Sequence, residues 1–292
     1  MSRPTVGLAT CDRLPELDEE GHLLIAALDR AGLAGRPAVW DDTSERWEAF
    51  DLVVVRATWD YVWRRDEFLE WAASLPRLAN PADVLRWNTD KRYLTELHAR
   101  GVPVVETHLL LPGEAFELPT APFVVKPAVG AGSIDIGRYG PDDLSVAAAH
   151  VHRLHSDDRV VVVQPYRDQV EDNGETELIF LDNRYSHAIR KSPMLDGDQG
   201  TVLGLFRAEA IMGREPTDLE RAVAQAALQE IPGGPHRLLY ARVDVILGPG
   251  GPEVLELEVT EPSLFLQHHG AAADRFAMAI RDRLNATGAN AV

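Results

Sequence analysis

The sequence predicts an α/β protein in two parts, with a parallel α/β layer at the N-terminus and a larger α+β region after it. Strand-like and helix-like patterns alternate between Thr5 and Leu75, as they do in parallel sheets that are covered by helices. After Pro112 and Gly113, β segments outnumber helical ones. The length of 292 residues, with 45% hydrophobic and 26% charged residues, is typical of a folded chain of about two domains.

The N-terminal elements follow from short apolar runs and from residues that end helices. Val53, Val54 and Val55 form a run that suits a strand covered on both faces, and Gly32 and Gly101 each end a helical pattern. The predicted elements are a strand at Thr5–Thr10, a helix at Asp18–Ala31, a strand at Asp51–Arg56, a helix at Arg64–Leu75, a helix at Asp90–Arg100 and an extended segment at Val102–Leu111. We place a domain boundary at residue 112.

The second part is predicted to mix antiparallel strands with fewer helices. The predicted strands are Phe123–Lys126, Ile134–Tyr139, Val160–Gln164 and Glu177–Lys191, and the predicted helices are Asp142–Leu154, Thr217–Ile231 and Ala271–Leu284. In the second of these helices an apolar stripe at helical spacing predicts the buried face, which comprises Leu219, Ala222, Val223, Ala226 and Ala227.

The composition restricts the partners of the protein. The 29 Lys and Arg residues and 46 Asp and Glu residues give a net charge of −17, which disfavours nucleic acid and anionic membrane surfaces. The single cysteine, Cys11, has no partner for an internal disulfide, and no apolar stretch reaches the roughly 18 residues of a membrane span. We therefore expect a cytoplasmic protein without nucleic-acid or membrane partners; a monomer and a homo-oligomer both fit this composition.

The segment from Leu239 to Pro262 predicts a β-hairpin. Two strand patterns flank a turn signal of glycine and proline at residues 248–251. A register in which the paired residue numbers sum to 500 sets Asp244 beside Glu256 and Arg242 beside Glu258. The aliphatic side chains of both strands then fall on the reverse face, and three carboxylates and one guanidinium lie together.

Such a cluster of carboxylates requires positive charge beside it. Two like charges about 4 Å apart repel by roughly 4 kcal/mol at an effective dielectric constant near 20, and a single arginine does not neutralise three acids. Magnesium is commonly bound by one or two carboxylates together with substrate phosphates, so a divalent cation fits this cluster. The alternative is the solvated face of an edge hairpin, where acidic and aliphatic residues alternate as in any amphipathic strand.

A candidate phosphate site lies upstream of the hairpin. The strand pattern Phe123–Val125 leads into Lys126, and a loop of small residues follows at Gly130–Ser133. Small residues let backbone N–H groups approach phosphate oxygens, and lysine supplies a point charge. The alternatives are a plain hairpin loop and, for Lys91 of the T-D-K sequence at residues 89–91, a lysine on a helix surface.

The order of these parts resembles the ATP-grasp superfamily, in particular the glutathione-synthetase-like ligases. The resembling motifs are T-D-K at 89–91, F-V-V-K-P at 123–127, the glycine loop, V-V-Q-P-Y at 162–166, R-V-D at 242–244 and E-L-E-V-T-E-P at 256–262. The resemblance covers nearly the whole chain. It implies an N-terminal pre-ATP-grasp αβ domain over residues 1–112 and two α+β subdomains that sandwich ATP: a small ATP-binding one over 113–165 and a C-terminal one with the metal site over 166–292.

The resemblance also implies where the nucleotide binds. Lys91 and Lys126 match lysines that contact the phosphates and the base of ATP. The residues that match the flexible flap over the phosphates are Gly130, Ala131, Gly132 and Ser133. Those that match the hinge segment beside adenine are Gln164 and Tyr166. Glu171 and Glu175 both match the acid that holds the ribose hydroxyls, and the sequence does not decide between them.

The metal and the transferred phosphate are assigned in the same way. Asp244 and Glu256 match ligands of Mg²⁺, with Mn²⁺ as an alternative ion, and Arg242 and Arg190 match arginines near the transferred phosphate. Glu258 stands where the family commonly has Asn. The extra carboxylate joins the expected metal ligands, and we expect it to tighten magnesium binding or to change the preferred ion.

The reaction that the resemblance implies is an ATP-dependent ligation. A substrate carboxylate attacks the γ-phosphorus to form an acyl phosphate, a nitrogen nucleophile displaces phosphate, and ADP and phosphate leave, while metal ions and arginines stabilise the developing charge. The alternatives are a kinase of the same fold, which transfers phosphate to a stable acceptor, and a nucleotide-binding regulatory module without turnover.

Within the superfamily, the chain looks most like the cyclo-ligases of cycloserine biosynthesis. The motifs that carry this likeness are L-A-T-C-D at 8–12, V-V-R-A-T-W-D-Y at 54–61, L-R-W-N-T-D-K-R-Y-L at 85–94 and L-E-L-E-V-T-E-P at 255–262. That family closes O-ureidoserine into a ring with a nitrogen of the same molecule as the nucleophile. An intermolecular amino acid or peptide ligase is the alternative.

The substrate is predicted to bind beyond the carboxyl ends of the N-terminal strands. The residues at two such ends are Asp12, Arg56, Thr58 and Asp60. Arg56 suits a carboxylate, and Asp60 or Asp12 suits the amino group of a small amino-acid-like substrate. In the alternative reading, Arg56 and Asp60 form a surface pair and the aromatic residues next to them cap the core.

Overall fold

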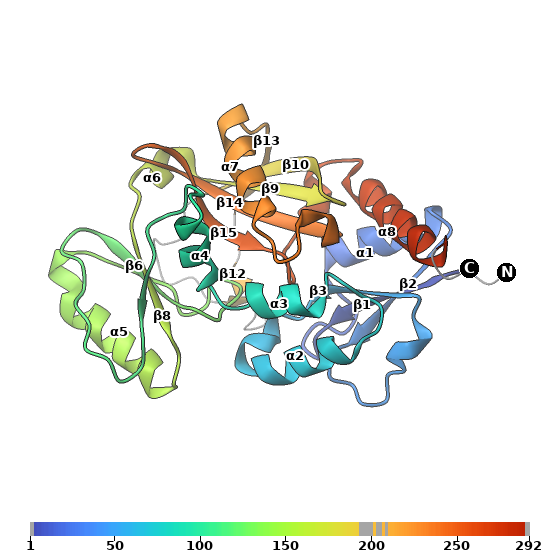
Figure 1. The fold of residues 1–292 in the computed structure, drawn as a ribbon, viewed down its shortest axis with the longest axis horizontal. Coiled ribbons are helices and arrows are strands. Elements are labelled where there is room, and N and C mark those ends of the chain that lie inside the picture. The colour runs from blue at the N-terminus through green and yellow to red at the C-terminus, as the bar shows by residue number, and fades with distance from the viewer. Residues whose placement is uncertain (1–2, 193–200, 203–205, 208–209, 290–292) are drawn as a thin grey trace.

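A computed structural model describes residues 3–192, 201–202, 206–207 and 210–289. Figure 1 shows that the described chain is built around three larger sheets, which we call the N-terminal, small and central sheets. They contain four, four and five strands among the described residues, and a two-stranded pair of β11 (Thr201–Val202) and β12 (Phe206–Arg207) is separate. The predicted α/β plus α+β class is confirmed.

The N-terminal sheet is parallel and has the order β2-β1-β3-β4. Its elements are β1 (Thr5–Thr10), α1 (Glu19–Arg30), β2 (Ala34–Val39), β3 (Leu52–Ala57), α2 (Arg65–Ser74) and β4 (Leu78–Ala79). The Asp18 carboxylate caps α1 by accepting from the amide of Gly21 at 2.8 Å, and Gly32 follows the helix with a φ of 80°. The sequence analysis missed β2, an edge strand in which Pro37 interrupts the strand pattern.

Two short helices link this sheet to the rest of the molecule. The predicted helix at Asp90–Arg100 is observed as α4 (Tyr93–Ala99), and α3 (Ala82–Asn88), which the sequence analysis missed, precedes it. The Asn88 side chain donates to the carbonyl of Leu257 at 2.6 Å and accepts from the amide of Val259 at 2.9 Å. The linking helices are therefore hydrogen-bonded to the backbone of a distant strand.

The small sheet is antiparallel and has the order β5-β8-β6-β7. Its elements are β5 (His108–Leu110), β6 (Phe123–Pro127), β7 (Gly137–Tyr139), α5 (Leu144–Ser156) and β8 (Val161–Pro165). The strand predicted at Ile134–Tyr139 is thus shorter than expected. Strand β5 lies in the first of the three domains expected from the sequence but pairs with β8 of the second, and the domain boundaries themselves stay a prediction.

The central sheet is antiparallel and has the order β13-β10-β9-β14-β15. Its strands are β9 (Glu175–Leu181), β10 (Arg184–Lys191), β13 (Ile211–Arg214), β14 (Tyr240–Gly248) and β15 (Gly251–Glu258), and the short α6 (Gln169–Asn173) precedes β9. The single strand predicted at Glu177–Lys191 is a hairpin, because Asp182 and Asn183 turn the chain with φ values of 47° and 59°.

The predicted register of the β14–β15 hairpin is confirmed where it bears on the site. Arg242 pairs with Glu258 and Asp244 with Glu256. Beyond Asp244 the register shifts by one residue, so that Val245 pairs with Val254 and Leu255 is the extra residue of a bulge. The prediction that every aliphatic side chain lies on the reverse face is therefore wrong for Leu255, which lines the cavity described below.

Helices α7 (Asp218–Gln229) and α8 (Ala272–Ala289) cover the central sheet. The buried face of α7 matches the predicted stripe only in part: Ala227 is buried and Val223 and Ala226 pack against the core, but Leu219 is 66% exposed. The buried residues are Glu220, Ala224, Ala227 and Leu228, and Glu220 is held in place by the cap of the helix, where Thr217 and Glu220 bond each other. Because the Glu220 side chain is buried in this cap, α7 turns a different face toward the sheet from the one that its apolar residues alone predict.

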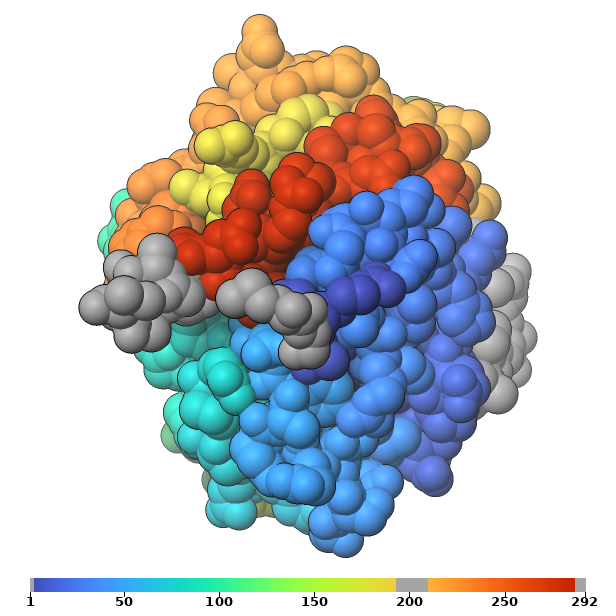
Figure 2. All heavy atoms as spheres, turned by 90° about the vertical axis from the view of Figure 1, so that its right-hand side faces the viewer, coloured from blue at the N-terminus to red at the C-terminus, as the bar shows by residue number. Residues whose placement is uncertain are grey.

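The C-terminal helix returns to the N-terminal sheet. Figure 2 shows the red segment that contains α8 lying against the blue N-terminal segment, and Arg30 of α1 forms an ion pair with Asp274 of α8 at 2.6 Å. One hydrophobic core extends from the strands of the N-terminal sheet to Tyr240 of the central sheet and Phe276 of α8. Among the described residues, no helix has both the length and the apolar character that a membrane crossing requires.

Candidate active site

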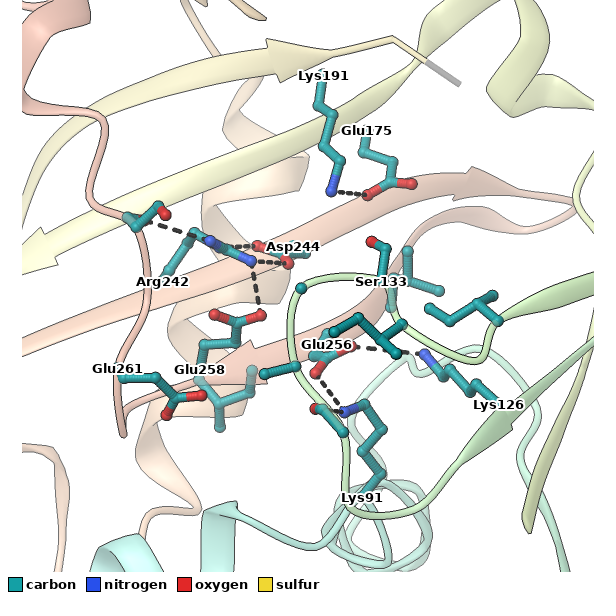
Figure 3. Close-up of a pocket in the computed structure, with 18 of the residues that line it drawn as sticks. Lys91, Lys126, Ser133, Glu175, Lys191, Arg242, Asp244, Glu256, Glu258 and Glu261 are labelled. Carbon is teal, nitrogen blue, oxygen red and sulfur yellow. Dashed lines mark hydrogen bonds and ion pairs between the residues drawn. The ribbon is translucent and has the colours of Figure 1, made fainter. Parts of the chain in front are cut away.

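A cavity of about 470 Å³ is lined by the small sheet, the central sheet, the linking helices and residues of the N-terminal part that lie outside its strands. Its volume is in the usual range of small-molecule sites, about 300–1,000 Å³. Thirteen of the residues predicted for the site line it: Lys91, Lys126, Gly130, Ala131, Gly132, Ser133, Gln164, Tyr166, Glu175, Arg242, Asp244, Glu256 and Glu258. Figure 3 shows how the charged residues of this set face one another.

Glu256 joins the linking helices to the small sheet. The Lys91 ammonium lies 2.9 Å from one carboxylate oxygen of Glu256, and the Lys126 ammonium lies 3.5 Å from the other. Lys91 also donates to the carbonyl of Gly130 at 2.8 Å, which ties it to the glycine loop. Burial opposes the charge of Glu256, but the two lysines outweigh it and lower the pKa of the carboxyl to about 2. Glu256 is therefore a carboxylate held between two cations.

Arg242 organises the other acids of the hairpin. Its guanidinium forms two hydrogen bonds to Asp244, at 2.8 and 2.9 Å, and another to Glu258 at 2.7 Å. Burial raises the pKa of Asp244 to about 7 and the pKa of Glu258 well above its usual value, and the neighbouring carboxylates add to both shifts although Arg242 counteracts them. One arginine thus holds two acids that compete for a single positive charge.

Two further charged residues at this point were missed by the sequence analysis. Glu177 of β9 is fully buried, pairs in register with Asp244, and lies 3.0 Å from the Arg242 guanidinium. Lys191 of β10 lies 3.6 Å from Glu177 and 3.9 Å from Glu175. Recognition of the hairpin turn between β9 and β10 would have revealed both, because alternation along each strand then directs Glu175, Glu177 and Lys191 to the same face.

One end of the cavity is apolar. Ile246 and Leu255 of the hairpin pack with Val170 and with Tyr166 of the predicted hinge. The Gln164 side chain, in contrast, is buried and donates to the Thr107 hydroxyl at 3.0 Å, so its position is fixed within the protein. This end of the cavity has the apolar surface that suits a planar heterocycle.

Two residues predicted for the site lie outside the cavity. Arg190 bonds through its guanidinium to the backbone carbonyls of Asp172 and Asn173, because it points to the opposite side of β10 from Lys191. Glu171 forms an ion pair with Arg138 at 2.8 Å and accepts a hydrogen bond from Tyr166. Of the two candidate ribose acids, only Glu175 lines the cavity.

The predicted substrate residues also lie elsewhere. Arg56 is buried and forms an ion pair with Glu20 of α1 while it donates to the carbonyl of Pro262 at 3.0 Å. Asp12 and Asp60 line a separate cavity, and Thr58 is fully buried. The strand ends bring different side chains to the main cavity, namely those of Trp59 and Tyr61, which the alternative reading had placed as caps of the core.

Glu261 is a further acid of the cavity that the sequence analysis missed. It follows β15, is 7% exposed, and lies beside Glu258 in Figure 3. Burial raises its pKa to about 7, although Lys91 and a hydrogen bond from Tyr61 favour the charged form. The E-L-E-V-T-E-P motif contained this residue, but its position past the strand gave no sign that it would face the same space.

The donor set fits a magnesium ion bound together with a phosphate ligand. Among the residues that the structure describes, no three His, Cys, Asp or Glu side chains are arranged to hold a metal ion by themselves. Magnesium, however, typically takes one or two carboxylates and completes its coordination with phosphate oxygens and water. Asp244 and Glu256 are adjacent across the strands and face the cavity, which is the kind of partial ligand set that such an ion uses.

Comparison with known proteins gives a family for the chain. Residues 6–80 match the family described as D-cycloserine synthetase DcsG, N-terminal domain. The cycloserine biosynthesis protein DcsG of Streptomyces lavendulae is 38% identical over 290 residues, which cover 92% of this chain and 95% of that protein.

Solved structures agree with that match. The crystal structure of D-cycloserine synthetase DcsG superposes with a TM-score of 0.84 at 35% identity, over 96% of this chain and 99% of that one. A D-alanine–D-alanine ligase from Bacillus anthracis, solved with ATP, has a TM-score of 0.67 at 16% identity over 99% of this chain and 100% of that one, a likeness of fold. The chain therefore belongs to the DcsG family of ATP-grasp ligases.

Proposed function

We propose that this ATP-dependent, ADP-forming ligase closes O-ureidoserine into the cycloserine ring. The names of its DcsG relatives, a cycloserine biosynthesis protein and a D-cycloserine synthetase, support this product, since identity extends over nearly the whole chain. O-ureidoserine is the substrate that the motif resemblance implies. A carboxylate of the substrate would take the γ-phosphoryl group, and the ureido nitrogen that is bonded to oxygen would displace phosphate and lose its proton. The carbamoyl group on that nitrogen would then be lost to water as carbon dioxide and ammonia. The observation that carries the proposal is the grouping of Lys91, Lys126, Arg242 and Lys191 with carboxylates that fit a cation, all in one cavity.

ATP would lie along the length of this cavity. The adenine would lie at the apolar end beside Tyr166 and Leu255, and Glu175, which lines the same cavity, would accept from the ribose hydroxyls. The glycine loop at residues 130–133 would cover the phosphates, and Lys91 and Lys126 would exchange Glu256 for phosphate oxygens. This exchange requires little reorganisation, because both lysines already point at an anion.

Asp244 and Glu256 would hold Mg²⁺, with Glu258 as an additional ligand and Mn²⁺ as an alternative ion. The ion would withdraw charge from the phosphate oxygens that it contacts. Arg242 stays between Asp244 and Glu258 and directs its positive charge to the same place, and Lys191 takes the position in the cavity that we had expected for Arg190. Such preorganised charge stabilises the transition state more than the ground state.

The remaining expectations belong to the same proposal. The division into domains at residues 1–112, 113–165 and 166–292 follows the three sheets in outline, with β5 as the exception noted above. A cytoplasmic location suits an enzyme that uses ATP and a small amino-acid-like substrate. We assign no role in the reaction to Cys11, because its thiol is buried and does not line the cavity. Burial also raises its pKa, which disfavours the thiolate.

The experiment is a coupled assay of ADP release with MgATP and O-ureidoserine, with the product identified by mass spectrometry. We expect ADP and phosphate to form with a ring-closed product and without any second amine. ADP release that requires a second amine would instead show an intermolecular ligase, and a phosphorylated end product would show a kinase. Arg242→Ala protein purified in the same way controls for contaminating ATPases.

A further inference from the structure

Glu261 has no role in the binding of ATP proposed above, although it lines the same cavity. The cavity-facing residues of β15 follow one another along the strand, with Leu255 at the apolar end, Glu256 between the lysines and Glu258 at Arg242. Glu261 comes next along the chain, and there the wall is shared with Trp59 of the N-terminal part. It therefore lies past the phosphate-binding groups, at the end of the cavity away from the apolar pocket.

The N-terminal part of the protein fixes the position of this carboxylate. The Trp59 indole donates to the backbone carbonyl of Glu261 at 3.2 Å, and the Tyr61 hydroxyl donates to the Glu261 side chain. Both aromatic residues are buried and belong to the short 3₁₀ helix η2 (Trp59–Trp63). Main chain and side chain are thus each held by one aromatic residue.

Lys91 and Arg242 act to lower the pKa of this carboxyl, but their ion pairs are with other acids. Lys91 forms its ion pair with Glu256, and Arg242 pairs with Asp244 and Glu258. Within the described part of the chain, no lysine or arginine forms an ion pair with Glu261. Burial of an unpaired carboxylate is costly, and it persists in a binding cavity where a ligand supplies the opposite charge.

We infer that Glu261 binds the α-ammonium group of the substrate and thereby makes the site select amino acids over simple carboxylic acids. This inference rests on the proposed function and identifies a group that recognises the part of the substrate that does not react. The substrate carboxylate would face Arg242 and the phosphate, and the ammonium would face Glu261 and the Tyr61 oxygen. The acids on the same wall, Glu256 and Glu258, would repel a substrate with a second carboxylate placed there.

The test compares O-ureidoserine with its analogue that lacks the α-amino group. Glu261→Gln keeps the size of the side chain and removes its charge. We expect wild-type protein to favour the amino acid in kcat/KM, and Glu261→Gln to lower kcat/KM for the amino acid at least about 30-fold, mainly through KM. The variant should leave kcat/KM for the des-amino analogue and KM for ATP unchanged. The control is Glu19→Gln, which removes an exposed acid that also lines the cavity. It should leave kcat/KM unchanged for both compounds.

Tyr61→Phe provides a second test, because it removes the hydroxyl that orients the Glu261 carboxylate. It should lower the preference for the amino acid over the des-amino analogue, but by less than Glu261→Gln does. Calorimetric titration of both compounds in the presence of a non-hydrolysable ATP analogue measures the preference without turnover. A wild-type protein that binds both compounds equally, or a Glu261→Gln protein that loses both equally, would overturn the inference. Failure of the proposed function is seen separately, as wild-type protein that binds the amino acid but releases no ADP.

Discussion

Glu256 and Glu258 lie two residues apart on one strand and face one cavity, yet their surroundings act on them in opposite directions. Lys91 and Lys126 hold the pKa of Glu256 at about 2, against the effect of burial. Burial and the neighbouring acids raise the pKa of Glu258 well above its usual value, although Arg242, which it shares with Asp244, acts in the opposite direction. A carboxyl whose charge is stabilised and one whose charge is penalised respond differently to the same substitution.

We expect Glu256→Gln to lower the free energy of unfolding at pH 7 by about 2 kcal/mol, because it leaves two buried lysines without their anion. Glu258→Gln should change it by less than about 1 kcal/mol, since a neutral group suits that position. Urea denaturation of nucleotide-free protein measures both. Saturating ATP should reduce the loss in Glu256→Gln, because phosphate supplies the missing anion. Equal losses in the two variants would contradict this account.

Lys126 should act on the nucleotide more than on the fold. Lys126→Met is expected to raise the apparent Kd for ATP at least about ten-fold, since it removes a buried positive charge from the phosphate-binding wall. Arg92→Met, which removes an exposed cation near Lys91, is the matched control and should leave the Kd unchanged. Titration of a fluorescent ATP analogue distinguishes them, and equal affinities in wild type and Lys126→Met would remove Lys126 from the ATP site.

At the scale of elements, the hairpin β14–β15 shows which structural features the sequence pattern can predict and which it cannot. Alternation fixed the pairing of Arg242 with Glu258, because a shift of one residue would have turned the acids into the core. The bulge at Leu255 was not predictable from alternation, since it depends on how the strand bends over the cavity. Recognition of Lys191 in place of Arg190 likewise required knowledge of which face of β10 meets its neighbours.

Asn88 supports this hairpin, because its side chain contacts one backbone group of β15 and one of Val259, the residue after the strand. Asn88→Ala leaves the carbonyl of Leu257 and the amide of Val259 without those partners in a buried place, and we expect a loss of about 1–3 kcal/mol in the free energy of unfolding. Chemical denaturation checks the value. Asn173→Ala, on the exposed end of α6, should cost much less, and a similar loss in both would count against a specific role for Asn88.

At the scale of the whole molecule, the two ends of the chain build the site together. The Glu20 carboxylate of α1 accepts from the amide of Leu264 at 2.9 Å and from that of Leu266 at 3.3 Å, and Arg56 neutralises it. The order of the ATP-grasp motifs identified the nucleotide site, but the contacts of Arg56 and Glu20 connect residues more than 200 positions apart. Local patterns contain no information about such pairs, and the four residues predicted to bind the substrate do not line the main cavity.

His187 links the central sheet to the same loop and makes its stability depend on pH. Its Nε2 donates to the carbonyl of Leu264 at 2.8 Å, and burial lowers its pKa from 6.5 to about 4. The unfolded chain then binds the proton more readily, so the stabilisation is complete above about pH 6.5 and is lost as the pH falls toward 4. Across that interval we expect a loss of up to about 3 kcal/mol from this residue.

Urea denaturation at a series of pH values between 7 and 4 measures this dependence. His187→Gln should be less stable than wild type at pH 7 but should lose less stability on acidification, since glutamine does not titrate. His98→Gln, which replaces an exposed histidine on α4, should follow the wild-type curve. A His187→Gln curve parallel to that of wild type would show that another group causes the acid sensitivity.

The anchoring of the loop after Pro262 by Glu20 restricts how this protein can be recombined with relatives. A chimaera that takes its first hundred residues from one homologue and the remainder from another would separate the acceptor carboxylate from the amides that it orients, and Trp59 and Tyr61 from Glu261. Exchanges of substrate specificity between such enzymes therefore need to transfer α1, η2 and the segment at residues 261–266 as one unit, although these lie at opposite ends of the gene.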